Sequence, residues 1–150
     1  MLDFLQSFRG KAVATTGSTE MSGDPTRTFD AILRAAATEG ASDVHFEPKE
    51  DGLVVRFRLD GEMHGHLRLP VAQREALLAR GKIFGGMDIT EKRLPQDGRM
   101  SIGLHNATRL NLRISTLPTL FGEKIETRLV ATIIERLGLR MHLLLLLFGL

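Results

Sequence analysis

Residues 53–69 read LVVRFRLDGEMHGHLRL, two stretches of alternating apolar and polar residues on either side of Asp60-Gly61. An Asp-Gly pair between two alternating stretches is a strong signal for a tight hairpin. Leu53, Val55 and Phe57 share one face of the first stretch, and Leu67 and Leu69 continue the same period in the second. This part of the chain therefore predicts two antiparallel strands with one face to bury.

The residues before this hairpin predict a helix and another strand. Asp24-Pro25 combines a preferred N-cap with proline at the first helical position, and Gly40 is a typical helix stop. Between them the apolar residues recur at helical spacing: Phe29, Ile32, Leu33 and Ala36. The following segment, 43–47, alternates with Val44 and Phe46 on one side and predicts a strand.

The residues after the hairpin predict a second helix and three more strands. The helix spans 71–84, with Ala76, Leu77, Ile83 and Phe84 on its apolar face, and Gly85-Gly86 ends it. A charged loop follows over 87–98. The strands are expected over 99–104, 108–115 and, beyond a turn at Pro118, 124–130.

This order of elements predicts an α+β fold: an antiparallel sheet of about five to six strands with helices packed on a face, a PAS-like two-layer domain. We expect residues 1–23 to be a flexible tail or linker and residues 24–130 to form one small folded domain. Residues 131–150 form a divergent apolar tail, and a truncated or excised chain would explain it.

Strand parity makes a sharper prediction about charge. Met100, Ile102 and Leu112 must all face the core, and residues directly opposite in an antiparallel pair share a face. With a three-residue connection over 105–107, Leu104 pairs with Thr108 and Arg99 falls opposite Arg113. Two like charges so placed repel each other, and an anion between them would turn that repulsion into binding.

An ordinary solvated face is the simpler interpretation of the same residues. Charged side chains on the outward face of a sheet are common and usually find partners within the chain. Here those partners would be Glu123, Glu126 or Asp97, while Arg109 and Lys124 would extend the basic patch.

Four segments together resemble a known family: ASDVHFEP (41–48), VRFRLDGEMH (55–64), MDITEKRLPQDGRMS (87–101) and LRISTLPTLFGEK (112–124). They are similar to the small domain that precedes the motor in type II secretion and type IV pilus assembly ATPases. Lys124 favours the pilus-assembly branch, because the secretion branch tends to carry arginine there. The resemblance covers about residues 25–130.

The resemblance implies a subunit of a hexameric cytoplasmic ATPase. In the family this domain precedes a RecA-like core, which binds ATP and Mg²⁺, and secretion or pilus components hold the hexamer at the inner membrane. Basic residues of the small domain reach the terminal phosphates of ATP. By motif position these are Arg99 and Arg113, with Lys124 a weaker third.

The chain departs from the family by lacking a phosphate-binding loop. Such a loop needs G-x-x-x-x-G-K-[ST], and neither Gly10-Lys11 nor Gly81-Lys82 has that context. We therefore expect no catalytic residue, no cofactor and no ATP hydrolysis for this chain alone.

The loop over 87–98 and the histidines are further candidates. Five polar residues of the loop, which are too polar for a core, are candidates for a domain interface: Glu91, Lys92, Arg93, Gln96 and Asp97. His64 and His66 share a strand face, but Glu62 and Glu47 are their only plausible fellow ligands, so no metal is expected. His45 is expected to have a structural role.

Composition leaves two other classes of function open. The net charge is +2 and there are no cysteines, which excludes disulfides and thiolate metal sites. A self-contained ligand-sensing or protein-interaction domain is the main alternative. Nucleic-acid binding through Arg56, Arg58, Arg109 and Arg113 is weaker, because phenylalanine is the only aromatic residue type and the charge is nearly balanced.

Overall fold

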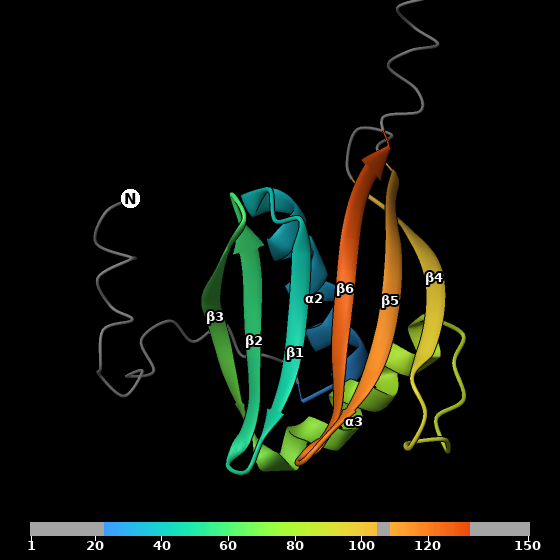
Figure 1. Ribbon diagram of the computed structural model, residues 1–150. Coiled ribbons are helices and arrows are strands. Elements are labelled where there is room, and N and C mark those ends of the chain that lie inside the picture. Colours follow the sequence, from blue (N-terminus) through green and yellow to red (C-terminus); the bar gives the residue numbers. More distant parts are fainter. Residues whose placement is uncertain (1–22, 105–108, 133–150) are drawn as a thin grey trace, which may run out of the picture.

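The computed structural model describes residues 23–104 and 109–132, which form one antiparallel sheet with two helices on one of its faces (Figure 1). The elements are α2 (Pro25–Glu39), β1 (Asp43–Lys49), β2 (Gly52–Leu59), β3 (Glu62–Pro70), α3 (Val71–Phe84), β4 (Gln96–Gly103), β5 (Arg109–Thr119) and β6 (Gly122–Thr132). The predicted α+β class is confirmed. The tails expected over 1–23 and 131–150 lie almost wholly outside the described residues, as does the pairing of Leu104 with Thr108.

The sheet has six strands in the order β3-β2-β1-β6-β5-β4. The three strands β1, β2 and β3 are successive along the chain, and β6 returns to pair with the open edge of β1. The Asp60-Gly61 turn forms as predicted, since both residues adopt the positive φ that such a turn requires. The last two hairpins thereby extend the first three strands into a single sheet.

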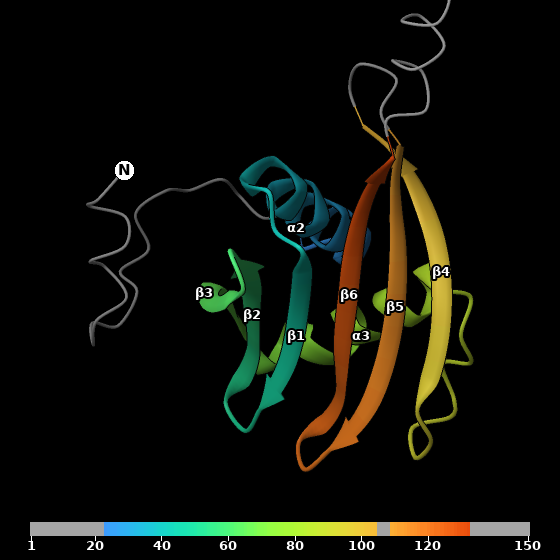
Figure 2. The same cartoon turned by 45° about the horizontal axis from the view of Figure 1, so that its top comes forward.

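Helix α2 begins and ends where its sequence signals place it. The Asp24 carboxylate accepts a hydrogen bond from the Thr26 amide at 3.0 Å, and Gly40 adopts the left-handed conformation at the C-terminus. The helix buries Phe29, whose ring stacks on Phe46 of β1 with the ring centroids 4.9 Å apart. Helix α2 thus covers the middle of the sheet, behind β1 and β6 in Figure 2.

Helix α3 has the predicted bounds but presents a different face to the core. Its buried residues are Leu77, Leu78, Gly81 and Lys82, whereas Ile83 is 51% exposed. Gly81 permits this rotation, because a Cβ there would lie 2.7 Å from Ile125 Cδ1 and 2.9 Å from Phe29 Cε2. The apolar face predicted for this helix is therefore wrong at Ile83 and at Ala76, which is also exposed.

Strands β4 and β5 are longer than predicted. Strand β4 already begins at Gln96, so Gln96 and Asp97 belong to the sheet rather than to the preceding loop. Strand β5 runs through Pro118, which pairs with Glu123, so the turn lies at Leu120-Phe121 instead. Proline is tolerated there because the pairing of β4 with β5 stops at Thr116, so this part of β5 lies at an edge of the sheet.

A buried ion pair fixes the loop between α3 and β4. The Lys82 ammonium lies 3.0 and 2.9 Å from the two carboxylate oxygens of Glu123 on β6 and donates to the backbone carbonyl of Glu91. The Gln96 side chain donates to the carbonyls of Asp88 and Glu91 and accepts from the Asp88 amide. These contacts connect the helix, the loop and the β5–β6 hairpin.

We predict that Gly98→Ala destabilises the fold. A Cβ on Gly98 would lie 2.0 Å from the carbonyl oxygen of Gly85, at the end of α3, so backbone must shift. We expect the free energy of unfolding to fall by about 1–3 kcal/mol, measured by urea denaturation. Gly103→Ala on the same strand is the control, because its Cβ would meet nothing within 4 Å. Equal stability of the two variants would refute this close approach.

We also predict that Lys82→Met is strongly destabilising. It leaves the Glu123 carboxylate buried without its partner, which costs about 3–5 kcal/mol, and the double variant with Glu123→Leu should recover part of that loss. Arg68→Met is the control, because Arg68 pairs with Asp51 on the surface at 3.7 Å and should change stability by at most about 1 kcal/mol. Similar losses for the two single variants would contradict a structural role for the buried pair.

Candidate functional site

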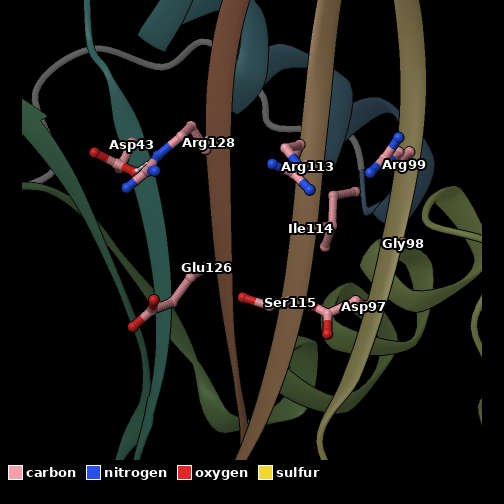
Figure 3. A pocket seen from close by; sticks show the side chains of 9 residues that line it. All are labelled: Asp43, Asp97, Gly98, Arg99, Arg113, Ile114, Ser115, Glu126 and Arg128. Carbon is pink, nitrogen blue, oxygen red and sulfur yellow. Dashed lines mark hydrogen bonds and ion pairs between the residues drawn. The ribbon is translucent and has the colours of Figure 1, made fainter.

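Three arginines lie side by side on the sheet face opposite the helices (Figure 3). Arg99 on β4 pairs with Arg113 on β5, which confirms the register predicted from parity, and Arg113 pairs in turn with Arg128 on β6. We call Arg99, Arg113 and Arg128 the arginine row. Their neighbours Leu112 and Ile114 point the other way and are buried, because side chains alternate along a strand.

The charges in the arginine row are only partly compensated within the described residues. Arg128 Nε lies 3.2 Å from Asp43 Oδ1, and Arg58 Nε lies 3.3 Å from the other oxygen of the same carboxylate. Arg99 and Arg113 are exposed, and no described carboxylate pairs with either of them. Since like charges directly opposite each other are destabilising, this pair costs stability as it stands.

Asp43 is ionised in this arrangement. Burial raises the pKa of its carboxyl, but the Ser42 hydroxyl and the guanidinium groups of Arg128 and Arg58 outweigh burial. The pKa therefore lies below its usual value, and the carboxylate is negative at neutral pH. It compensates the Arg128 end of the row.

A shallow, open cavity of about 500 Å³ lies over the arginine row. It is lined by the row together with Asp43, Asp97, Gly98, Ile114, Ser115 and Glu126. Asp97 and Glu126 flank Ser115 one rank further along the strands, so the positive charge is confined to one end of the cavity. Guanidinium groups donate several hydrogen bonds in a fixed fork that matches phosphate oxygens. This end of the cavity is suited to a multiply charged anion.

Lys124 does not join the arginine row. Its ammonium lies 2.6 Å from Glu126 Oε1, and Lys124 is not among the residues that line the cavity. His45 sits between Glu126 and Glu47, with its Nδ1 3.7 Å from Glu126 Oε1. Burial and the nearby Lys124 ammonium lower the pKa of His45, and they outweigh the opposite effect of Glu126 and Glu47. The pKa therefore lies below its usual value, and the imidazole is neutral at pH 7.

The five loop candidates have different surroundings. The Glu91 carboxylate accepts from the Arg93 amide within the loop, while Gln96 binds the loop backbone and so has a structural contact. Lys92 forms an exposed pair with Glu75 at 3.5 Å, and the Arg93 side chain is 89% exposed. Asp97 lines the cavity. Lys92 and Arg93 are thus exposed and available to another surface.

Sequence reasoning missed Arg128 and its partner Asp43. Arg99 and Arg113 are opposed by strand parity. Across a two-residue turn at Leu120-Phe121, strand parity also places Arg128 beside Arg113. The Asp43 contact, in contrast, depends on the pairing of β1 with β6, which no local pattern indicates.

Residues 23–104 and 109–132 contain no group of three histidine, aspartate or glutamate side chains that could hold a metal ion. His66 instead stacks on Phe57, with the ring centroids 4.0 Å apart. None of the helices described there has the length and apolar character needed to cross a membrane.

Comparison with known proteins identifies the family. Residues 20–142 match the family model described as "Type II/IV secretion system protein", a match that continues past the boundary expected at residue 130. The chain is 46% identical over 99 residues to the type IV pilus assembly ATPase PilB of Myxococcus xanthus, covering 66% of this chain and 18% of that protein. It is 42% identical over 104 residues to the type II secretion system protein HxcR of Pseudomonas aeruginosa, covering 69% of this chain and 22% of that protein.

The chain therefore spans about a fifth of the length of these relatives, and its described residues form the α+β sheet that carries the arginine row. The family match covers most of the sequence. The chain belongs to the Type II/IV secretion system protein family.

Proposed function

We propose that this chain is the small regulatory domain of a hexameric ATP-driven motor for type IV pilus assembly or type II secretion. In this proposal Arg99 and Arg113 contact the terminal phosphates of ATP, which an ATPase core binds together with Mg²⁺. The observation that carries the proposal is the directly opposed pair Arg99 and Arg113 at the positive end of an open cavity, where neither pairs with a carboxylate of residues 23–104 or 109–132.

In this proposal the ATPase core binds the nucleotide, and the small domain only contacts its phosphates. The chain has no G-x-x-x-x-G-K-[ST] loop, so it offers no backbone cradle for the phosphates of a nucleotide. The guanidinium groups of Arg99 and Arg113, which no carboxylate of the described part of the chain compensates, are suited to the exposed side of phosphates that another domain already holds. The chain alone should not hydrolyse ATP.

The physical effect of the two arginines would be charge neutralisation. Negative charge spreads over the γ-phosphate oxygens during phosphoryl transfer, and guanidinium groups stabilise it. The same contact would relieve the repulsion between Arg99 and Arg113. Docking of the small domain on the core would thus be favoured when the γ-phosphate is present, which gives the domain a means of sensing the nucleotide.

The proposal also names the partners that the domain would contact. Its partners would be the ATPase core, neighbouring subunits of the hexamer and secretion or pilus components at the inner membrane, on the cytoplasmic side. Lys92 and Arg93, whose side chains are 63% and 89% exposed, are the first residues to test at such an interface. Lys124 is the weakest phosphate contact, because Glu126 already pairs with its ammonium.

A chimera tests the proposal. Residues 24–130 of this chain replace the matching segment of the Myxococcus xanthus relative, and Mg²⁺-dependent ATP hydrolysis is measured. We predict that Arg99→Gln and Arg113→Gln each lower kcat by about 100-fold or more, as loss of an arginine finger does. Lys124→Gln should lower it less.

Arg68→Gln is the matched control for the chimera, because it removes an exposed arginine of β3 that does not line the cavity. It should leave kcat within about twofold. Size-exclusion chromatography checks that each variant still assembles. Full ATPase activity of both Arg99→Gln and Arg113→Gln in intact assemblies would disprove the proposed phosphate contact.

A further inference from the structure

Arg99 lies on a strand that is supported on one side only. Strand β4 is at an edge of the sheet and, among the described residues, pairs with β5 alone (Figure 1). Arg113 lies on β5, which has β4 on one side and β6 on the other. A strand at an edge lacks half of the backbone pairing that holds a central strand. The position of Arg99 therefore depends more on other contacts than that of Arg113 does.

Gln96 provides such contacts at the first residue of β4. Its side-chain nitrogen donates hydrogen bonds to the backbone carbonyls of Asp88, at 2.9 Å, and Glu91, at 3.2 Å. Its side-chain oxygen accepts from the Asp88 amide at 2.9 Å. The backbone amide of Gln96 donates to the hydroxyl of Thr116 on β5, at 3.1 Å. Gln96 thus joins the start of β4 to the loop over 87–95 and to β5.

The loop that Gln96 contacts is itself anchored to the fold. The Glu91 carbonyl that accepts from Gln96 also accepts from the ammonium of Lys82, whose side chain is 2% exposed. Two residues further along β4, Gly98 lies against the carbonyl of Gly85 at the end of α3, where a Cβ would come within 2.0 Å. Residues 96–98 are therefore held against α3 and the loop, and Arg99 follows directly.

We propose that Gln96 is a positioning residue for Arg99. By fixing the start of β4 against the loop, it holds the Arg99 guanidinium group at a defined place over the cavity. This inference rests on the proposed contact of Arg99 with the terminal phosphates of ATP. It gives Gln96, which the sequence marks only as a candidate for a domain interface, a part in the reaction without a contact to the nucleotide.

Gln96 acts on Arg99 through the backbone. Side chains alternate along a strand, so the side chains at positions 96 and 99 lie on opposite faces of β4. Arg99 lines the cavity, and Gln96 is not among the residues that do. A misplacement of a catalytic group by about 1 Å can lower a rate by about 100-fold. A small displacement of β4 is therefore enough to weaken the effect of Arg99.

Loss of the Gln96 side chain should leave the chain folded. Asp88 is exposed, so water can replace the two hydrogen bonds that its backbone makes with Gln96. The Glu91 carbonyl keeps the Lys82 ammonium as a donor. Gln96→Leu keeps about the same side-chain size and removes all three side-chain hydrogen bonds. It therefore releases the start of β4 without leaving a buried polar group unpaired.

A spin label at position 99 tests whether Gln96 fixes this part of β4. The chain contains no cysteine, so one introduced by Arg99→Cys is the only residue labelled. Electron paramagnetic resonance then reports the mobility of the nitroxide in the 150-residue chain. Gln96→Leu should increase that mobility, whereas a label introduced by Arg113→Cys, on the central strand β5, should not change. Gln73→Leu, near the start of α3, is the matched control and should change neither label.

The chimera tests whether the position of Arg99 affects ATP hydrolysis. Gln96→Leu should lower kcat by about tenfold and leave KM within about twofold, because in the proposed function the ATPase core binds the nucleotide. In an Arg99→Gln background the same substitution should change kcat by less than about twofold, since its effect passes through Arg99. An equal reduction in both backgrounds would show a role in stability alone and overturn the inference. Gln73→Leu should leave kcat within about twofold.

The remaining outcomes separate this inference from the proposed function. If Gln96→Leu leaves the label at position 99 unchanged, Gln96 does not hold β4 and the inference is wrong. The inference is also wrong if that label becomes more mobile but kcat stays unchanged while Arg99→Gln slows the chimera, and the proposed function then stands. If Arg99→Gln itself leaves the chimera fully active, the proposed function fails and the inference fails with it.

Discussion

The register of β4, β5 and β6 is the constraint on which the site depends. The pairing of β4 with β5 and of β5 with β6 runs without a bulge, so every residue of one strand has a fixed partner on the next. A slip by one residue would turn the arginine row into the core and the buried leucines and isoleucines into solvent. The hydrophobic face therefore fixes the register, and the register forces three like charges into one rank.

The far side of the sheet holds this register in place. Gly98 of β4 touches the backbone at the end of α3, and the buried Lys82–Glu123 pair connects α3 to the β5–β6 hairpin. Both contacts lie near the end of the sheet where the loop over 87–95 crosses between helix and strand. They stabilise the scaffold beneath the arginines, which offsets the repulsion that the arginine row imposes. The stabilising contacts and the arginine row thus lie on opposite faces of one sheet.

Local patterns predicted most of the fold and part of the site. The Asp60-Gly61 turn, the cap at Asp24 and the opposition of Arg99 and Arg113 follow from propensity and strand parity, which the short-range sequence encodes. The face of α3 did not follow, because Lys82 is buried only through a glutamate far along the chain. The start of β4 at Gln96 was missed because its side chain supports the preceding loop. The tie between Arg128 and Asp43 depends on tertiary pairing of β1 with β6.

A structure of the chimera with a non-hydrolysable ATP analogue and Mg²⁺ would show directly whether Arg99 and Arg113 contact the γ-phosphate. The quantity to measure is the distance from the guanidinium nitrogens of Arg99 and Arg113 to the nearest γ-phosphate oxygen. We expect charge-assisted hydrogen bonds of about 2.7–2.9 Å from both residues. Guanidinium groups of both residues paired with carboxylates of the core or of a neighbouring subunit, with the γ-phosphate contacted by other residues, would contradict it.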